Sequence, residues 1–172
     1  MFERFYQARD GRGFAFGTHC WSADPSLYEV CGHLGYDYIW IDNEHGGMTF
    51  PMIYSGIVAA NASGAAAIVR VPGHSVEDVK PVLEIGPQGI VFPMVNSAQQ
   101  AEVCAKHCMY PPKGTRSYGP LRAINYYEAL YAVYAAFIFK FGVGSFSVDH
   151  EADFLHAADS DFVNDHIRND II

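Results

Sequence analysis

Short apolar runs alternate with segments of helical period from residue 14 to residue 108 of the chain. The run at residues 38–42 is apolar on both faces, which is typical of a strand in a parallel sheet covered by helices. Pro72 and Gly73 mark the end of the run after it. The pattern predicts four strands, at residues 14–20, 38–42, 66–71 and 89–95.

Four predicted helices separate these strands, and local signals mark several of their ends. They lie at residues 25–33, 49–61, 75–84 and 98–108. Asp24 is a suitable N-cap for the first helix, and Gly35 stands just past its C-terminus. Ser75 is a suitable cap for the third. Strand–helix alternation repeated four times predicts right-handed βαβ units and one parallel sheet, so the fold class is α/β.

The pattern changes beyond residue 125. Residues 126–146 are aromatic and apolar, compatible with one helix and one strand, whereas acidic residues dominate from Ser147 onward. The longest apolar run, residues 129–139, is shorter than the roughly 20 residues of a membrane helix, so we interpret it as a buried segment. We therefore divide the chain into residues 1–125 and an atypical second segment, residues 126–172, whose fold stays open.

Length and composition restrict the class of protein further. The chain has 172 residues, whereas a complete eight-stranded α/β barrel usually needs about 250. A hydrophobic content of 50% with 17% charged residues is typical of a packed globular core. The net charge of −8 argues against a nucleic-acid partner. No export signal or membrane span is visible, so we expect a cytoplasmic protein with reduced thiols and no membrane partner.

Polar side chains stand where three of the predicted strands end. Asp42, Glu44 and His45 follow the second strand, Arg70 ends the third, and residues 93–96 end the fourth. In parallel α/β folds the active groups gather at the carboxyl ends of the strands. We therefore expect any active site to lie at this edge of the predicted sheet.

Each of these groups also has an interpretation without chemistry. Histidine titrates near neutrality, so His45 beside two carboxylates could act as a base, or the turn could be a solvated loop that keeps the strand end soluble. Arg70 could hold a carboxylate or a developing enolate, or it could form an ion pair with Asp42, Glu44 or Glu84. For Glu84 itself, a surface carboxylate is the usual explanation. The residues alone leave these alternatives open.

Two further clusters are weaker candidates. Cys104 and Cys108 share one face of the fourth predicted helix, but two ligands do not make a zinc site, so we interpret them as buried thiols. The acidic residues 149–153 match no calcium-loop spacing and are interpreted as a solvated tail.

Four sequence blocks, spanning residues 14–122, resemble the HpcH/HpaI-type aldolase and citrate lyase family. The similarity is to its metal-dependent class II pyruvate aldolases of the 4-hydroxy-2-oxoheptanedioate type. The blocks are residues 25–37, 41–46, 68–72 and 89–119. The resemblance implies a (β/α)8 TIM barrel assembled as a homo-oligomer. Residues 1–125 would then be the N-terminal half of such a barrel, a partial barrel with four βα units.

The resemblance also implies an activity, the reversible aldol cleavage of a 4-hydroxy-2-oxo acid to pyruvate and an aldehyde. The 2-oxo acid would be the small-molecule partner of the site. His45 matches the family's catalytic base, and Arg70 matches the arginine that stabilises the enolate-like transition state. Asp42 matches a carboxylate close to the water shell of the metal. Glu84 occupies the place of an aspartate that increases the basicity of the base.

The substrate-binding positions implied by the resemblance are Arg70, Pro93 and Val95. A divalent cation, Mg²⁺ or Mn²⁺, is implied as Lewis acid on the enolate. The blocks that carry the family's metal ligands are not found after Arg122, so we assign no metal ligand to this chain. His19 is a second departure, since it stands where related enzymes often carry an aromatic side chain.

Two functional hypotheses follow from these matches and departures. The first is a carbon–carbon lyase of the pyruvate aldolase type. The second is a truncated or catalytically inactive homologue, a half-barrel that acts as an oligomerising or structural protein, because the open edges of a half-barrel invite pairing with a second copy. Release of pyruvate from a 4-hydroxy-2-oxo acid distinguishes the two.

Overall fold

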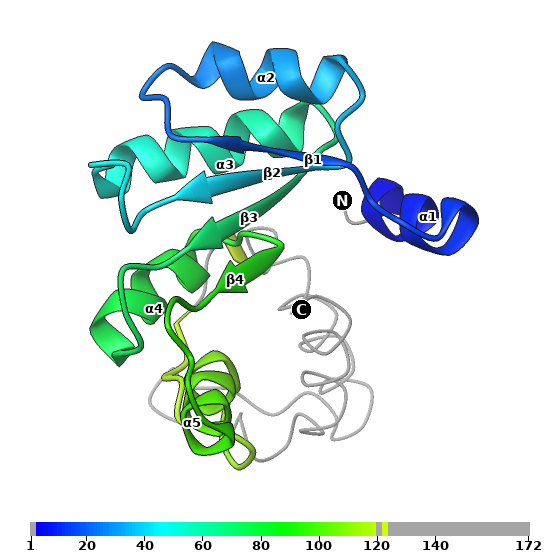
Figure 1. Ribbon diagram of the computed structural model, residues 1–172. Coiled ribbons are helices and arrows are strands. Elements are labelled where there is room, and N and C mark those ends of the chain that lie inside the picture. The colour runs from blue at the N-terminus through cyan, green and yellow to red at the C-terminus, as the bar shows by residue number, and fades with distance from the viewer. Residues whose placement is uncertain (1–2, 120–121, 124–172) are drawn as a thin grey trace, which may run out of the picture.

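The structure is a computed structural model of the chain, and it describes residues 3–119 and 122–123. Within these residues four strands and five helices follow one another along the chain (Figure 1). The strands are β1 (Gly17–Cys20), β2 (Tyr38–Asp42), β3 (Ala66–Arg70) and β4 (Gly89–Val91). The helices are α1 (Glu3–Arg12), α2 (Pro25–His33), α3 (Phe50–Ala62), α4 (Val76–Glu84) and α5 (Ala98–Cys108).

The strands form one parallel sheet in the order β1-β2-β3-β4. Trp40 at the centre of β2 is in register with His19 of β1 and Ile68 of β3. One step along the same face, Asp42 is in register with Arg70. Figure 1 shows helices α2 to α5 following the outer side of the curved sheet, as expected for successive βα units.

The helix caps that the sequence predicts are present. The Asp24 side chain accepts a hydrogen bond from the Ser26 N–H at 2.9 Å, and Ser75 Oγ accepts one from the Asp78 N–H at 3.2 Å. Gly35 follows α2 with a φ of 99°, a left-handed conformation that favours glycine. Local side chains therefore fix where these helices begin and end.

The core lies between the sheet and its helices. The outward-facing side chains Ile39 and Ile41 of β2 and Val69 of β3 are fully buried, and they pack against α3 and α4 through Ile57 and Val79. Cys104 and Cys108 are buried as expected, and burial raises the pKa of Cys108 to about 11. All four cysteines carry free thiols. Among the described residues, no helix is long and apolar enough to cross a membrane.

The structure differs from the sequence prediction by more than one residue at three elements. β1 begins at Gly17, three residues later than expected, because the Phe16 N–H donates to the Asp37 carboxylate at 2.8 Å instead of joining the ladder. β4 ends at Val91, because Pro93 has no N–H and Met94 turns the chain with a φ of 51°. Helix α1 was not predicted. The predictions for residues 126–172 lie outside the described residues.

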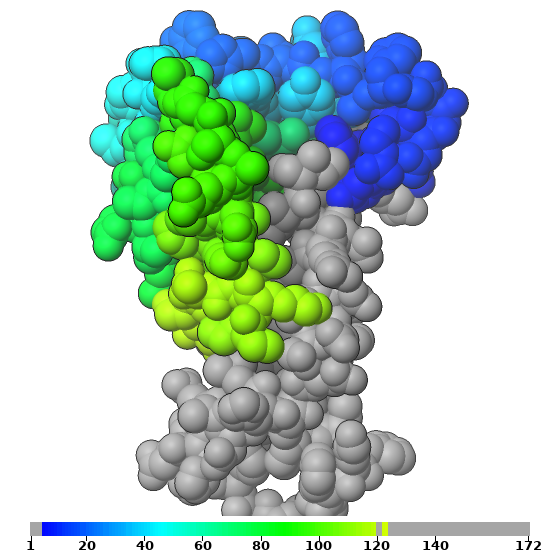
Figure 2. All heavy atoms as spheres, turned by 60° about the horizontal axis from the view of Figure 1, so that its bottom comes forward, coloured from blue at the N-terminus to red at the C-terminus, as the bar shows by residue number. Residues whose placement is uncertain are grey.

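The described part has two distant ends. In Figure 2 the blue N-terminal residues of α1 and the green helix α5 lie on opposite sides of the space-filling surface. The β1 and β4 strands are accordingly the outer strands of the described sheet. This open arrangement is what four consecutive units of a barrel wall produce.

Candidate functional site

The predicted site residues of β2 and β3 meet at the carboxyl edge of the sheet. The Arg70 guanidinium donates two hydrogen bonds to Asp42, from Nε to Oδ1 at 2.9 Å and from Nη2 to Oδ2 at 2.5 Å. Only 2% of the Asp42 surface is exposed. The Arg70 hydrogen bonds hold the pKa of Asp42 well below its usual range, and Asp42 in turn raises the pKa of Arg70. The two side chains therefore form a charged pair at pH 7.

The same carboxylate shapes the turn that follows β2. Asp42 Oδ1 accepts hydrogen bonds from the backbone N–H groups of Glu44 at 2.9 Å and His45 at 3.4 Å. Aspartate commonly stabilises a turn in this way. A Cβ on Gly46 would lie 2.6 Å from the Asp42 carbonyl oxygen and 2.8 Å from Cβ of Trp21, so the turn leaves no room for a side chain there. One buried carboxylate thus positions both the arginine and the turn.

Glu44 joins the arginine to the predicted base. Its Oε2 lies 2.9 Å from Nη1 of Arg70 and 3.6 Å from Nε2 of His45. The His45 side chain is 73% exposed, which leaves its ring accessible to a small molecule. The sequence indicates that Asp42, His45 and Arg70 share this edge, and the structure brings them together. The ion pairs of Arg70 with Asp42 and Glu44, considered above as an alternative, are also present.

Glu84 lies apart from this cluster. Its Oε1 accepts hydrogen bonds from Nη2 and Nε of Arg116 at 3.2 and 3.4 Å, and its Oε2 is buried without a hydrogen-bond partner among the described residues. The expectation that Glu84 is an ordinary surface carboxylate is therefore wrong. Among the described residues, the carboxylate in contact with His45 Nε2 is that of Glu44.

Pro93 and Val95 lie in the loop after β4, at the same edge of the sheet. The carbonyl oxygen of Pro93 contacts Nε2 of His74, from the loop after β3. Met94 between them adopts the left-handed conformation, and its carbonyl oxygen accepts a hydrogen bond from Asn96 Nδ2 at 2.8 Å. Left-handed backbone at a residue other than glycine is uncommon and needs such local support. Val95 is exposed.

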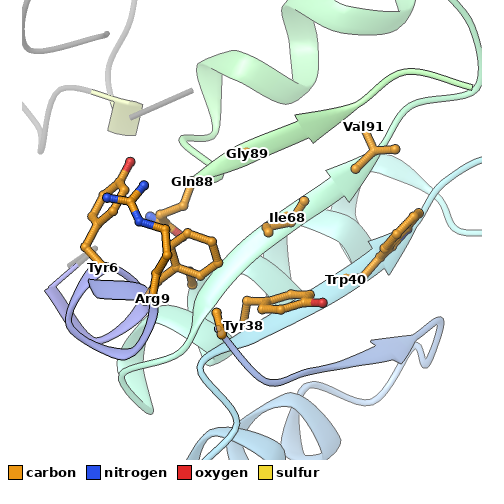
Figure 3. Close-up of a pocket in the computed structure, with 11 residues that line it drawn as sticks. Tyr6, Arg9, Tyr38, Trp40, Ile68, Gln88, Gly89 and Val91 are labelled. Carbon is orange, nitrogen blue, oxygen red and sulfur yellow. The ribbon is translucent and has the colours of Figure 1, made fainter. Parts of the chain in front are cut away.

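An open cavity of about 380 Å³ lies along the inner face of the sheet. Figure 3 shows Tyr38, Trp40, Ile68 and Val91 along this cavity, with Tyr6 and Arg9 of α1 at one end. The Trp40 ring centre is 5.7 Å from Cζ of Arg70, so this tryptophan lies between the apolar cavity and the charged pair. Alternation along β2 puts residues 38, 40 and 42 on one face, a signal in the sequence that could have identified Trp40.

The described residues do not provide a metal site. No group of three or more His, Cys, Asp or Glu side chains among them is placed to hold a metal ion. Both oxygens of Asp42 are engaged by Arg70, and Glu44 Oε2 is paired with the same guanidinium. The donor set at this edge thus does not fit the divalent cation that the resemblance implies, and no chemical step is derived through it.

The family comparison agrees with this fold. The HpcH/HpaI aldolase/citrate lyase family model matches residues 16–158, which is most of the chain. The chain belongs to this family. The expected partial barrel of the TIM-barrel class is confirmed by its parallel α/β sheet and by its structural neighbours in the family.

Curated relatives are aldolases. The chain is 43% identical over 102 residues to a 4-hydroxy-2-oxovalerate aldolase of Novosphingobium aromaticivorans, a match that covers 59% of this chain and 39% of the relative. It is 32% identical over 111 residues to a 2-dehydro-3,6-dideoxy-6-sulfogluconate aldolase of Pseudomonas putida, covering 64% and 44% of the two chains. The chain thus spans less than half the length of these relatives.

A solved structure shows the same arrangement. An HpcH/HpaI aldolase/citrate lyase family protein from Burkholderia cenocepacia J2315 superposes with a TM-score of 0.67 at 25% identity. The superposition covers 75% of this chain and 53% of that protein. The parallel sheet and its helices are therefore those of this aldolase family.

Proposed function

We propose that the chain is a carbon–carbon lyase of the pyruvate aldolase type, which cleaves a 4-hydroxy-2-oxo acid reversibly to pyruvate and an aldehyde. The observation that carries this proposal is the contact of Arg70 with Asp42 and Glu44 beside the exposed His45, at the carboxyl edge of the sheet. The family and the names of the curated relatives support it.

The proposed reaction needs a base and a positively charged group that stabilises the enolate. The base removes the proton of the 4-hydroxyl group, the bond between C3 and C4 breaks, and the aldehyde leaves. The electron pair of that bond moves into the 2-oxo group to give the enolate, which is then protonated at C3 to form pyruvate. His45 is proposed as the base because its ring is exposed and histidine is the side chain that most often serves as a general base.

Arg70 is proposed to stabilise the enolate charge. Guanidinium has five N–H donors in a fixed plane, and contacts with Asp42 and Glu44 occupy three of them in this structure. The two carboxylates hold the plane in place, and the remaining donors can face a substrate oxygen. A cation fixed before the reaction stabilises developing charge without the cost of reorganisation.

The resemblance also implies roles for the loop after β4 and for Glu84. Pro93 and Val95 would line the substrate site from the loop after β4. Tuning of the base by Glu84 has less support, because Glu84 is held by Arg116 while Glu44 contacts His45. A divalent cation would need ligands from beyond the described residues, so the test includes metal as a separate variable.

The test is pyruvate release from 4-hydroxy-2-oxoheptanedioate by the purified chain, coupled to lactate dehydrogenase, with Mn²⁺, with Mg²⁺ and with EDTA. We expect pyruvate release, and the comparison of Mn²⁺ and Mg²⁺ with EDTA measures how far this release depends on a divalent cation. A sample that melts cooperatively but releases no pyruvate under any of these conditions would contradict the proposal. That result would favour the inactive half-barrel.

A further inference from the structure

His19 of β1 contacts the charged pair from the strand on the other side of β2 from Arg70. Its Nε2 lies 3.3 Å from Oδ2 of Asp42, the same oxygen that Arg70 Nη2 approaches. His19 is in register with Trp40, so its side chain lies on the sheet face that carries Asp42 one step further along. Neither the proposed reaction nor the resemblance gives this histidine a role.

Two tryptophan rings flank the imidazole. The His19 ring meets Trp21 edge-on with centroids 4.8 Å apart, and it meets Trp40 edge-on at 5.8 Å. Packing of this kind restricts the rotation of the imidazole. The two contacts restrain the His19 ring with Nε2 beside Asp42 Oδ2, although 43% of the His19 side chain is exposed.

The contact completes the surroundings of a buried carboxylate. Asp42 Oδ1 accepts from Arg70 Nε and from two backbone N–H groups, whereas Oδ2 faces only Arg70 Nη2 and His19 Nε2 among the described residues. An ionised carboxylate is an acceptor only, so the favourable form of this contact carries the hydrogen on Nε2. With 3% of its side chain exposed, Asp42 has little water to replace a lost partner.

We infer that His19 is a positioning residue, which holds the Asp42 carboxylate and through it the Arg70 guanidinium in the orientation needed for the enolate. The consequence for catalysis rests on the proposed function, whereas the contact itself does not. The residue has no direct role in proton transfer here. His19 acts by placing the Arg70 guanidinium, so its substitution should change kcat more than KM.

The kinetic test compares two substitutions that differ in one property. His19→Phe keeps a flat ring between the tryptophans but has no donor, whereas His19→Gln keeps an N–H group at a similar reach. We expect His19→Phe to lower kcat about tenfold with little change in KM, because the Asp42 carboxylate loses a polar neighbour, and His19→Gln to recover most of the loss. His33→Gln on α2, an exposed histidine remote from the sheet edge, is the matched control and should leave both constants unchanged.

A second measurement does not depend on turnover. Urea unfolding of His19→Phe, Asp42→Asn and the double variant forms a thermodynamic cycle. We expect the effect of His19→Phe on the unfolding equilibrium constant to be at least about threefold smaller in the Asp42→Asn background. If Asp42→Asn does not fold, Arg70→Gln replaces it, because the same contact should couple His19 to Arg70.

These outcomes separate the two proposals. Additive unfolding effects, or a His19→Gln variant as slow as His19→Phe, would overturn the positioning role. If the unfolding effects of His19→Phe and Asp42→Asn are coupled but the protein releases no pyruvate, the contact between the two residues is supported and the proposed aldolase activity is rejected. Wild-type kinetics in His19→Phe, with an active parent, would reject the catalytic consequence.

Discussion

At the scale of single residues, the site is organised around one buried carboxylate. Asp42 binds the Arg70 guanidinium, caps the turn that carries Glu44 and His45, and is contacted by His19. A side chain with this many charged and polar partners must stay ionised, and its lowered pKa reflects that. Substitutions at Asp42 should therefore affect stability and activity together, while those at His45 should affect activity alone.

Asp42→Asn keeps the shape of the side chain and removes its charge. We expect it to lower the free energy of unfolding by about 2 kcal/mol at pH 7, the usual loss for a buried hydrogen bond to a charged group. Urea unfolding at pH 7 measures this. Glu29→Gln, an exposed carboxylate on α2, is the control and should change the free energy of unfolding little.

The same variant tests the pH dependence. Because the folded-state pKa of Asp42 lies below its unfolded value of about 3.9, its ionisation contributes stability that is complete above that value and declines as the pH falls toward the folded pKa. Stability measured from pH 6 down to pH 3 should therefore decline less steeply in Asp42→Asn than in the wild type. Parallel curves of unfolding free energy against pH for the two proteins would show that Asp42 does not cause the loss of stability in acid.

His45→Gln should abolish most activity without unfolding the protein. Removal of a general base typically costs about 100-fold or more in kcat. The ring is 73% exposed and contacts only Glu44 Oε2 at 3.6 Å among the described residues, so packing should not change. Steady-state kinetics and a thermal melt measure the two effects. A variant with the parent's kcat would show that His45 is not the base.

At the scale of the elements, the βα order and most boundaries could be predicted from the sequence. The helices with side-chain caps or a following glycine, such as α2 with Asp24 and Gly35, begin and end where expected, because these signals act within a few residues. Helix α1 was missed because its residues mix charges and aromatics without an apolar stripe. The short length of β4 depends on the left-handed conformation of Met94, which no local sequence pattern predicts.

The sequence predicts where the candidate site lies on the sheet, but it does not predict which side chains contact one another there. The strand ends put Asp42, His45 and Arg70 at one edge, which follows from parallel topology alone. The pairing of Glu84 with Arg116, and of His19 with Asp42, joins residues 32 and 23 positions apart in the chain. Such contacts depend on side-chain directions between elements, which spacing in a single sequence does not encode.

The turn after β2 gives a test at this scale. Gly46→Ala would place a methyl group 2.6 Å from the Asp42 carbonyl oxygen, so the turn must move and displace His45. We expect a lower melting temperature and a loss of activity. Gly11→Ala in α1, where nothing lies within 4 Å, is the control and should be neutral or slightly stabilising. Equal melting temperatures for the two variants would mean that the turn is not tightly packed.

At the scale of the whole molecule, we expect association of copies of the chain. Helix α2 exposes Leu27 and Val30, and its C-cap residue Leu34 continues the same helical spacing. Phe14 and Phe16 are exposed just before β1. An apolar surface of this kind is typical of an interface between proteins. Paired copies would also cover the outer strand β1.

Charged substitutions on this face test the expectation. Sedimentation of the wild type should show an oligomer, and Val30→Lys combined with Leu34→Glu should shift it toward monomer without lowering the helix content. Glu77→Lys on α4, on an exposed polar position, is the matched control and should leave the sedimentation profile unchanged. A wild-type monomer that melts cooperatively would contradict an interface on α2.

The strand order β1-β2-β3-β4 has a consequence for how the protein is made. Each described strand hydrogen-bonds to the described strand made just before it, so no pairing in this part waits for a strand from further along the chain, and each pairing closes over one βα unit. As the chain emerges from the ribosome, each new βα unit can pair with the strand that has already formed. Arg70 then arrives at a finished Asp42 turn, and the charged edge of the sheet is assembled in the order in which the residues are translated.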